Sequence, residues 1–168
     1  RRHVVGRVRG GWCGPPAVGV PEAPGGLLRT ICKEFGIDVG HRVMRHESQC
    51  ANVHGHRYRV LVYVQATELD DVGRVVDFGV VKQLVGGWLL RELDHGYLHH
   101  PDDDVGALLR QRGMKVRAMP ADLGEPTAEN IATLVLREAQ VLLWEKGLHV
   151  PRVVVWETPT SSAEATAP

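Results

Sequence analysis

The feature of this sequence that most constrains its fold is the strict alternation of side chains over residues 54–66. A β-strand points alternate side chains to opposite faces of its sheet. The stretch is therefore predicted to be a strand with a long apolar face that other elements must cover, and with two imidazoles at one end of that face. The residues that share this face are His54, His56, Tyr58, Val60, Val62 and Val64.

The other periodic segments complete an α+β pattern. Residues 30–43 alternate as a second strand that carries His41 near its end, and residues 152–158 form a further strand. Two stretches have the helical period. The first follows Asp77, a suitable N-cap, and contains the helix-weakening pair Gly86-Gly87, whereas the second opens at Thr127.

The chain is predicted to be one domain over residues 29–159 with a loose segment at each end. Residues 1–28 are dense in Gly and Pro and predict a flexible N-terminal extension, and residues 160–168 are small and polar and predict a loose C-terminal tail. Within the domain, residues 101–124 read as mixed and loop-like, with a short helix near 105–112.

The composition argues against several classes of protein. Twenty Lys and Arg balance twenty Asp and Glu, whereas a nucleic-acid binder is normally basic. No membrane span is predicted, because the sequence contains no run of about 18 apolar residues. Three cysteines do not suit a disulfide framework and indicate a reducing compartment. We therefore expect a cytoplasmic protein with no nucleic-acid or membrane partner.

The strongest chemical signal is the pair His54 and His56. On a strand the two imidazoles point the same way, about 7 Å apart along the backbone, which suits the chelation of zinc. His41 would join them if the two strands are antiparallel neighbours, and three histidines leave an open fourth position, as in catalytic zinc sites. Alternatively, Cys50 is a fourth ligand that closes a structural site, or the histidines are ordinary surface residues.

Two further features have a functional and an ordinary interpretation. Asp94 beside His95 suits an acid–base pair, in which the carboxylate orients the ring, but it also suits a polar helix end. Glu157 ends an otherwise apolar strand, where a carboxylate is costly unless it is paired, binds a ligand or reaches solvent.

Taken in order, these motifs resemble the 6-pyruvoyltetrahydropterin synthase and 6-carboxytetrahydropterin synthase family. The resemblance runs from about residue 31 to residue 158. It rests on a strand ending in His41, on Cys50-x-x-x-His54-Gly55-His56, on Val76-Asp77-Phe78, on Leu93-Asp94-His95-Gly96-Tyr97-Leu98, on Pro126-Thr127-Ala128-Glu129-Asn130, and on Glu157-Thr158.

The resemblance implies a role for each matching residue. It implies that zinc is held by His41, His54 and His56, that Cys50 is the general base, and that Asp94 and His95 complete the proton-transfer set. It also implies that Glu157 anchors the pterin, with Thr127 and Thr158 lining its site. A carboxylate suits this task because it can accept two neighbouring N–H groups of the pterin in a bidentate manner.

The spacing from Cys50 to His54 resembles the carboxy-forming, queuosine-pathway branch of the family. The implied reaction converts 7,8-dihydroneopterin triphosphate to 6-carboxy-5,6,7,8-tetrahydropterin with release of acetaldehyde and triphosphate, toward 7-deazaguanine nucleosides. The alternatives are the sister reaction that yields the pyruvoyl product, and a non-catalytic zinc- or pterin-binding module in which Cys50 closes the metal site.

The implied fold is the tunnelling fold (T-fold), a curved antiparallel sheet of four main strands with two helices on one face. The implied assembly is a trimer or hexamer with active sites between subunits. The segment 101–124 is longer than a minimal member needs, and residues 1–28 have no counterpart. The fourth strand is expected near Val150 or within the segment 101–124.

Overall fold

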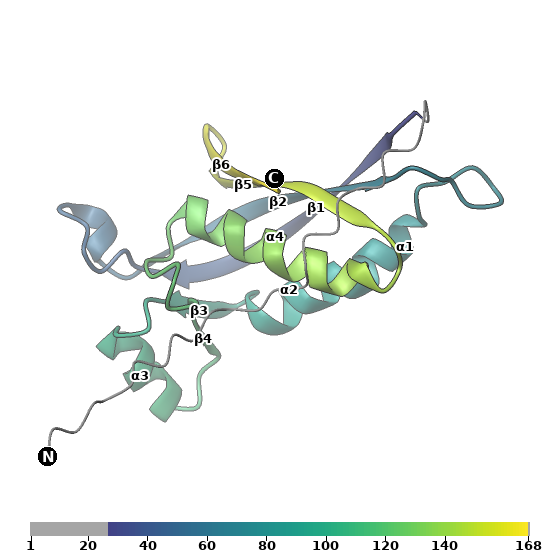
Figure 1. The fold of residues 1–168 in the computed structure, drawn as a ribbon. Helices are drawn as coiled ribbons and strands as arrows, with labels where there is room; N and C mark the ends of the chain where they lie inside the picture. Colours follow the sequence, from purple (N-terminus) through teal and green to yellow (C-terminus); the bar gives the residue numbers. More distant parts are fainter. Residues whose placement is uncertain (1–26, 168) are drawn as a thin grey trace, which may run out of the picture.

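The structure, a computed structural model, describes residues 27–167 and shows one mixed sheet with helices on one face (Figure 1). The strand order is β4-β3-β1-β2-β5-β6. The strands are β1 (Arg29–His41), β2 (His54–Ala66), β3 (Gly96–His99), β4 (Val116–Ala118), β5 (His149–Thr158) and β6 (Ser161–Thr166). The helical elements are η1 (Gln49–Ala51), α1 (Phe78–Val81), η2 (Lys82–Gly86), α2 (Gly87–Glu92), α3 (Asp104–Gln111) and α4 (Ala128–Trp144).

The central pair of strands is the one that the alternation predicts. β1 and β2 are antiparallel, with Arg29 opposite Ala66 at one end and His41 opposite His54 at the other. The predicted face of β2 is buried from Tyr58 to Val64, and it packs with Ile37 and Val39 of β1 in the core. Both predicted strands are confirmed, and β2 has the predicted bounds.

The sheet differs from the expected four antiparallel strands. β1, β2, β5 and β6 are antiparallel neighbours, but β3 and β4 extend the sheet in parallel beyond β1, which makes six strands. The fourth antiparallel strand, β6, comes from the segment predicted to be a loose tail, so that prediction is wrong for Ser161–Thr166. The error arises because β6 consists of small and polar residues with weak strand preference, yet Ala165 packs against the core.

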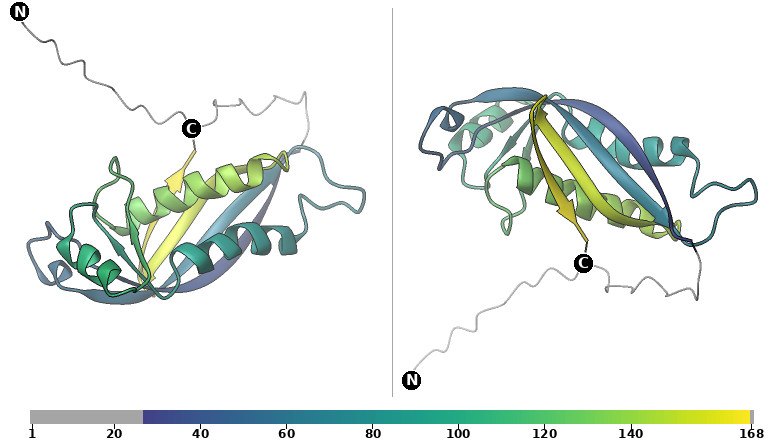
Figure 2. Two further views of the ribbon diagram at one scale, coloured as in Figure 1. Left: turned by 90° about the horizontal axis from the view of Figure 1, so that it is seen from below. Right: turned by 90° about the horizontal axis from the view of Figure 1, so that it is seen from above.

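Two helical segments cover one face of the sheet (Figure 2). The first runs continuously from α1 through the π-helical turn η2 to α2, and the Asp77 carboxylate caps it by accepting the Gly79 N–H at 2.7 Å. Gly86 lies against the sheet, where an added Cβ would come within 2.8 Å of the Phe35 ring. Gly86, which weakens helix propensity, thus allows this close approach, whereas Gly87 has open space around it.

α4 is the second covering helix, and its start reaches the end of the sheet that carries the histidines. The Thr127 hydroxyl caps it by accepting the Asn130 N–H at 3.3 Å, as predicted. The segment 101–124 is more regular than expected, because it contains β4 as well as the predicted short helix, α3. The predicted extension over residues 1–28 lies outside the described residues apart from its last two. Among residues 27–167, no helix has the length and apolar character needed to cross a membrane.

Candidate active site and metal centre

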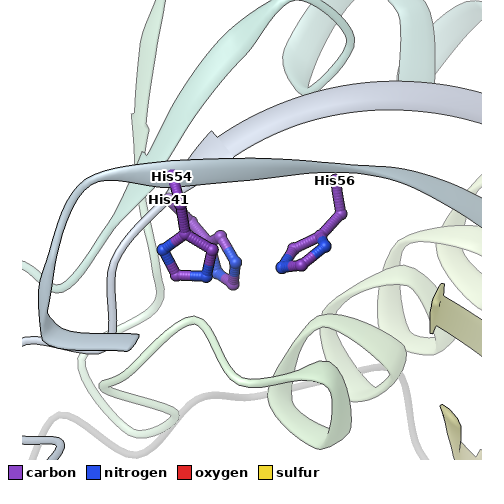
Figure 3. Close-up of side chains that lie close together, drawn as sticks. All are labelled: His41, His54 and His56. Carbon is purple, nitrogen blue, oxygen red and sulfur yellow. The ribbon is translucent and has the colours of Figure 1, made fainter. Parts of the chain in front are cut away.

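Three histidines from β1 and β2 meet on the helix-covered face of the sheet (Figure 3). The pairing register places His41 opposite His54 and Val39 opposite His56. The ring centroids of His41 lie 4.4 Å from His54 and 5.3 Å from His56, and one ligand nitrogen from each of the three rings lies within 4.8 Å of the others. The structure therefore brings together the three predicted ligands, as antiparallel pairing requires.

Backbone carbonyls orient two of these rings. His41 Nδ1 lies 3.0 Å from the Pro126 carbonyl and His54 Nδ1 lies 2.7 Å from the Asn52 carbonyl. A carbonyl only accepts, so each Nδ1 carries the proton and each Nε2 keeps its lone pair for a metal. Burial lowers the pKa of His41, against the opposing effect of the Pro126 bond, so this ring favours the neutral form that a metal requires.

Tyr58 and Glu157 stand directly beside the histidines. The buried Tyr58 hydroxyl donates to Glu157 Oε1 at 3.2 Å and lies 3.2 Å from His41 Nε2. Glu157 Oε1 is also 3.7 Å from His41 Nε2 and 3.8 Å from His56 Nε2. Burial, together with the Glu157 charge, raises the pKa of Tyr58, so its hydroxyl keeps its proton and remains a donor.

A cavity of about 660 Å³ opens in front of this cluster. The three histidines, Cys50, Thr127, Glu157 and Thr158 all line it, so the β1–β2 hairpin and its loop, the start of α4 and the end of β5 converge there. Cys50 is half-buried and not in a disulfide, and it belongs to the loop between β1 and β2. Seven of the nine predicted site residues thus share one cavity.

Asp94 and His95 form their predicted pair elsewhere. Asp94 Oδ2 lies 2.8 Å from His95 Nδ1, and Asp94 Oδ1 accepts the Asp38 N–H at 2.8 Å. Burial raises the pKa of Asp94, but these bonds outweigh it and leave the pKa below its ordinary value. The His95 side chain is 77% exposed, and neither residue lines the cavity of its own chain.

The sequence does not predict two supporting residues. It predicts Tyr58 on the histidine face, but the contact of Tyr58 with Glu157 spans 99 positions and depends on how β5 pairs with β2. The Glu125 carboxylate accepts the N–H groups of Met44 at 2.9 Å and Arg45 at 3.2 Å, and so ties the Cys50 loop to the start of α4. The sequence offered no signal for this tie, because it joins a loop to a residue about 80 positions away.

Comparison with known proteins agrees with this geometry. Residues 30–168 match the family model described as 6-pyruvoyl tetrahydropterin synthase. The chain is 36% identical to a 6-carboxy-5,6,7,8-tetrahydropterin synthase of Rickettsia bellii, over 79% of this chain and 96% of that protein. It is 33% identical to the protein of the same name from Aquifex aeolicus, over 80% and 95% of the two chains.

Solved structures show the same fold. An uncharacterized protein of Wolinella succinogenes superposes with a TM-score of 0.72 at 24% identity, covering 84% of this chain and 99% of that one. The 6-pyruvoyl tetrahydropterin synthase of Caenorhabditis elegans superposes with a TM-score of 0.61 at 19% identity, covering 85% and 98%. The curved sheet, its covering helices and the histidine cluster therefore define a T-fold protein with a candidate metal centre.

The chain belongs to the 6-pyruvoyl tetrahydropterin synthase family, whose model matches all but its first 29 residues. The donor set of this family member fits a metal ion. Three imidazole nitrogens converge, two of them in a fixed tautomer, and no protein side chain other than Glu157 and Tyr58 is recorded at hydrogen-bond or ion-pair distance from their Nε2 atoms in the described residues.

Proposed function

We propose that the chain is a zinc-dependent lyase that converts 7,8-dihydroneopterin triphosphate and one water molecule to 6-carboxy-5,6,7,8-tetrahydropterin, releasing acetaldehyde and triphosphate in the queuosine pathway. The observation that carries the proposal is the convergence of three histidines, Cys50 and Glu157 on one cavity. The names of the Rickettsia and Aquifex relatives support this branch of the family.

His41, His54 and His56 would hold the zinc. Histidine nitrogens are preferred zinc ligands, and three protein ligands leave a position open for substrate. When bound, zinc would polarise the oxygen atoms of the substrate side chain and make the neighbouring C–H groups more acidic. The Pro126 and Asn52 carbonyls hold His41 and His54 in the tautomer that this role needs.

The remaining cavity residues would bind the pterin and move its protons. The Glu157 carboxylate accepts two neighbouring N–H groups of the pterin ring, and the Tyr58 hydroxyl orients that carboxylate by donating to its Oε1. Thr127 and Thr158 line the same cavity and offer hydroxyl groups to the ring. Cys50 Sγ takes a proton from the substrate side chain, as a general base.

Asp94 and His95 would act in the cavity of a neighbouring subunit. They form a hydrogen-bonded pair with an exposed imidazole, yet they do not line the cavity of their own chain. Among residues 27–167, β3 pairs with β1 only from Val39 to His41, which leaves the first part of β1 as an open edge, and β6 and the short β4 are the terminal strands of the sheet. Edge pairing between copies would close a trimer, or a hexamer of two trimers.

The proposed function is consistent with the partner and the compartment expected from the sequence. Its partner is a small pterin rather than a nucleic acid or a membrane, because the net charge is zero and the polar groups of the site converge on one cavity. The cysteine usage fits the cytoplasm as its compartment.

The test is product identification. Zinc-loaded protein is incubated with 7,8-dihydroneopterin triphosphate and the products are analysed by mass spectrometry, with Cys50→Ala as the inactive variant and Cys32→Ala, on the same chain but away from the cavity, as the matched control. Acetaldehyde and 6-carboxytetrahydropterin from the wild type and Cys32→Ala alone support the proposal. A pyruvoyl product would instead assign the chain the sister reaction. If the zinc-loaded oligomer forms no product, the alternative of a non-catalytic binding module is favoured.

A further inference from the structure

The Asp94–His95 pair sits in a turn with an uncommon backbone conformation. His95 has φ 54°, and it is the only residue other than glycine with a positive φ in the part of the chain that the structure describes. This left-handed region is unfavourable for residues with a side chain, because the Cβ atom is crowded there. A residue other than glycine adopts it where the surrounding structure holds it in place. Whatever fixes this turn, between α2 and β3, also fixes the direction in which the His95 ring points.

Strand β1 holds one side of the turn. The His95 N–H donates to the Asp38 carbonyl at 2.7 Å, and the Asp38 N–H donates to the Asp94 carboxylate at 2.8 Å. The same carboxylate holds His95 Nδ1 through its other oxygen. These bonds use the His95 N–H and the Asp94 side chain, and they leave the Asp94 carbonyl to another partner.

Lys115 is that partner. Its Nζ donates to the Asp94 carbonyl at 2.6 Å and to the Leu90 carbonyl at 2.7 Å. A cation at the end of a helix is favourable, because the last carbonyls have no partner within the helix. The aliphatic part of the Lys115 side chain also lies over Gly96, where an added Cβ would be 3.4 Å from the Lys115 Cγ and Cδ atoms. The Lys115 backbone is held as well, because the Tyr97 N–H donates to its carbonyl at 3.0 Å.

We propose that Lys115 is a positioning residue for the Asp94–His95 pair, acting through its bond to the Asp94 carbonyl. The inference rests on the proposed function only for the task of the pair in proton transfer. Lys115 directly precedes β4 (Val116–Ala118), and β4 pairs with β3 immediately after the turn that carries the pair. The pairing of these two strands thus holds Lys115 beside the pair.

The charge of Lys115, like its hydrogen bonds, favours the Asp94–His95 pair, because it lowers the pKa of the Asp94 carboxyl. Burial alone would raise the pKa of Asp94, but the Asp38 N–H, the His95 ring and, to a smaller extent, the Lys115 ammonium together lower it. The ionised carboxylate is the form that accepts from His95 Nδ1 and thereby sets the tautomer of the ring.

The test compares three substitutions in the full-length oligomer. Lys115→Met removes the ammonium and keeps an unbranched side chain, whereas Lys115→Arg keeps the charge and N–H donors for both carbonyls. Lys146→Met is the control, at an exposed lysine beyond α4. We expect Lys115→Met to lower kcat by about 10- to 100-fold with KM and zinc content unchanged, as for outer partners of catalytic groups. Lys115→Arg is expected to retain most of the kcat.

A second measurement does not depend on activity. The ring ¹⁵N shifts of His95, assigned with His95→Gln, report the tautomer set by Asp94, and we expect Lys115→Met alone to change them. If the wild type has no turnover, the proposed function fails while these shifts still decide the positioning role. The inference is overturned if Lys115→Met matches Lys146→Met in kcat and in the His95 shifts, or if it lowers only the melting temperature.

Discussion

Tyr58 gives the sharpest test of how this site binds its substrate. Its hydroxyl is buried and lies between the proposed metal ligand His41 and the proposed pterin anchor Glu157, 3.2 Å from each. Tyr58→Phe removes one oxygen atom and keeps the ring in the core. The Glu157 carboxylate then loses its only side-chain hydrogen-bond donor recorded among the described residues.

The expected size of the effect follows from this contact. A hydrogen bond to a charged group contributes about 1.5–3 kcal/mol, and about 1.4 kcal/mol corresponds to a factor of ten. We therefore expect Tyr58→Phe to raise the KM for 7,8-dihydroneopterin triphosphate by about 10- to 100-fold. The kcat should change little, because Glu157 would hold the ring equally in the ground and transition states. Zinc content should also stay the same, because the Pro126 carbonyl still orients His41.

Steady-state kinetics with Tyr63→Phe as the matched control would measure this effect. Tyr63 lies on the same strand but on its opposite face, where Arg152 stacks over its ring at 3.9 Å. A KM for Tyr58→Phe equal to that of Tyr63→Phe would refute the reasoning, and so would a loss confined to kcat.

Four further substitutions test the supporting structure. Glu125→Gln can accept only one of the two loop N–H groups, so we expect a kcat loss of about tenfold, comparable to the loss of other supporting contacts, with an unchanged far-UV spectrum; a wild-type kcat would contradict this role. Gly106→Ala places a Cβ within 2.4–2.6 Å of the buried His99 ring and should cost about 1–3 kcal/mol of unfolding free energy in denaturant titration, whereas Gly87→Ala, with open space around it, should stabilise by about 0.5–1 kcal/mol. Asp103 is buried, which opposes ionisation, but Arg42, the Val105 N–H and Tyr97 hold its pKa below the ordinary value. A folded-state pKa below the unfolded value of about 3.9 stabilises the protein above that pH, and this stability is lost as the pH falls through the folded-state pKa. Asp103→Asn should therefore make the melting temperature depend less on pH below about pH 4. A profile parallel to that of the wild type would exclude Asp103 as a source of the acid sensitivity.

The strand pair that carries the three histidines was predictable because its signal is local and strong. Alternation over residues 54–66 fixes both the strand and the face on which His54 and His56 lie. An antiparallel partner ending in His41 then completes the cluster, since the register places His41 opposite His54. The two helices were predictable for the same reason, from their period and from the caps at Asp77 and Thr127.

The remaining features depend on contacts between distant residues. β4 has three residues and β6 is rich in Ser, Ala and Thr, so neither has a strand pattern of its own, and each exists because a neighbouring strand pairs with it. The contacts of Tyr58 with Glu157 and of Lys115 with Asp94 depend equally on tertiary structure. The sequence predicts the candidate site residues, but not which groups orient them.

We propose that one metal ion on His41, His54 and His56 makes this chain a pterin lyase. The most direct measurement is a zinc titration of metal-free oligomer, in which bound zinc and product formation from 7,8-dihydroneopterin triphosphate are followed in the same samples. We predict that turnover rises in proportion to bound zinc and stops rising at one zinc per chain, and that His56→Ala, a partly exposed ligand, lowers both together. Full turnover without zinc, or zinc binding that His56→Ala leaves unchanged, would contradict this account.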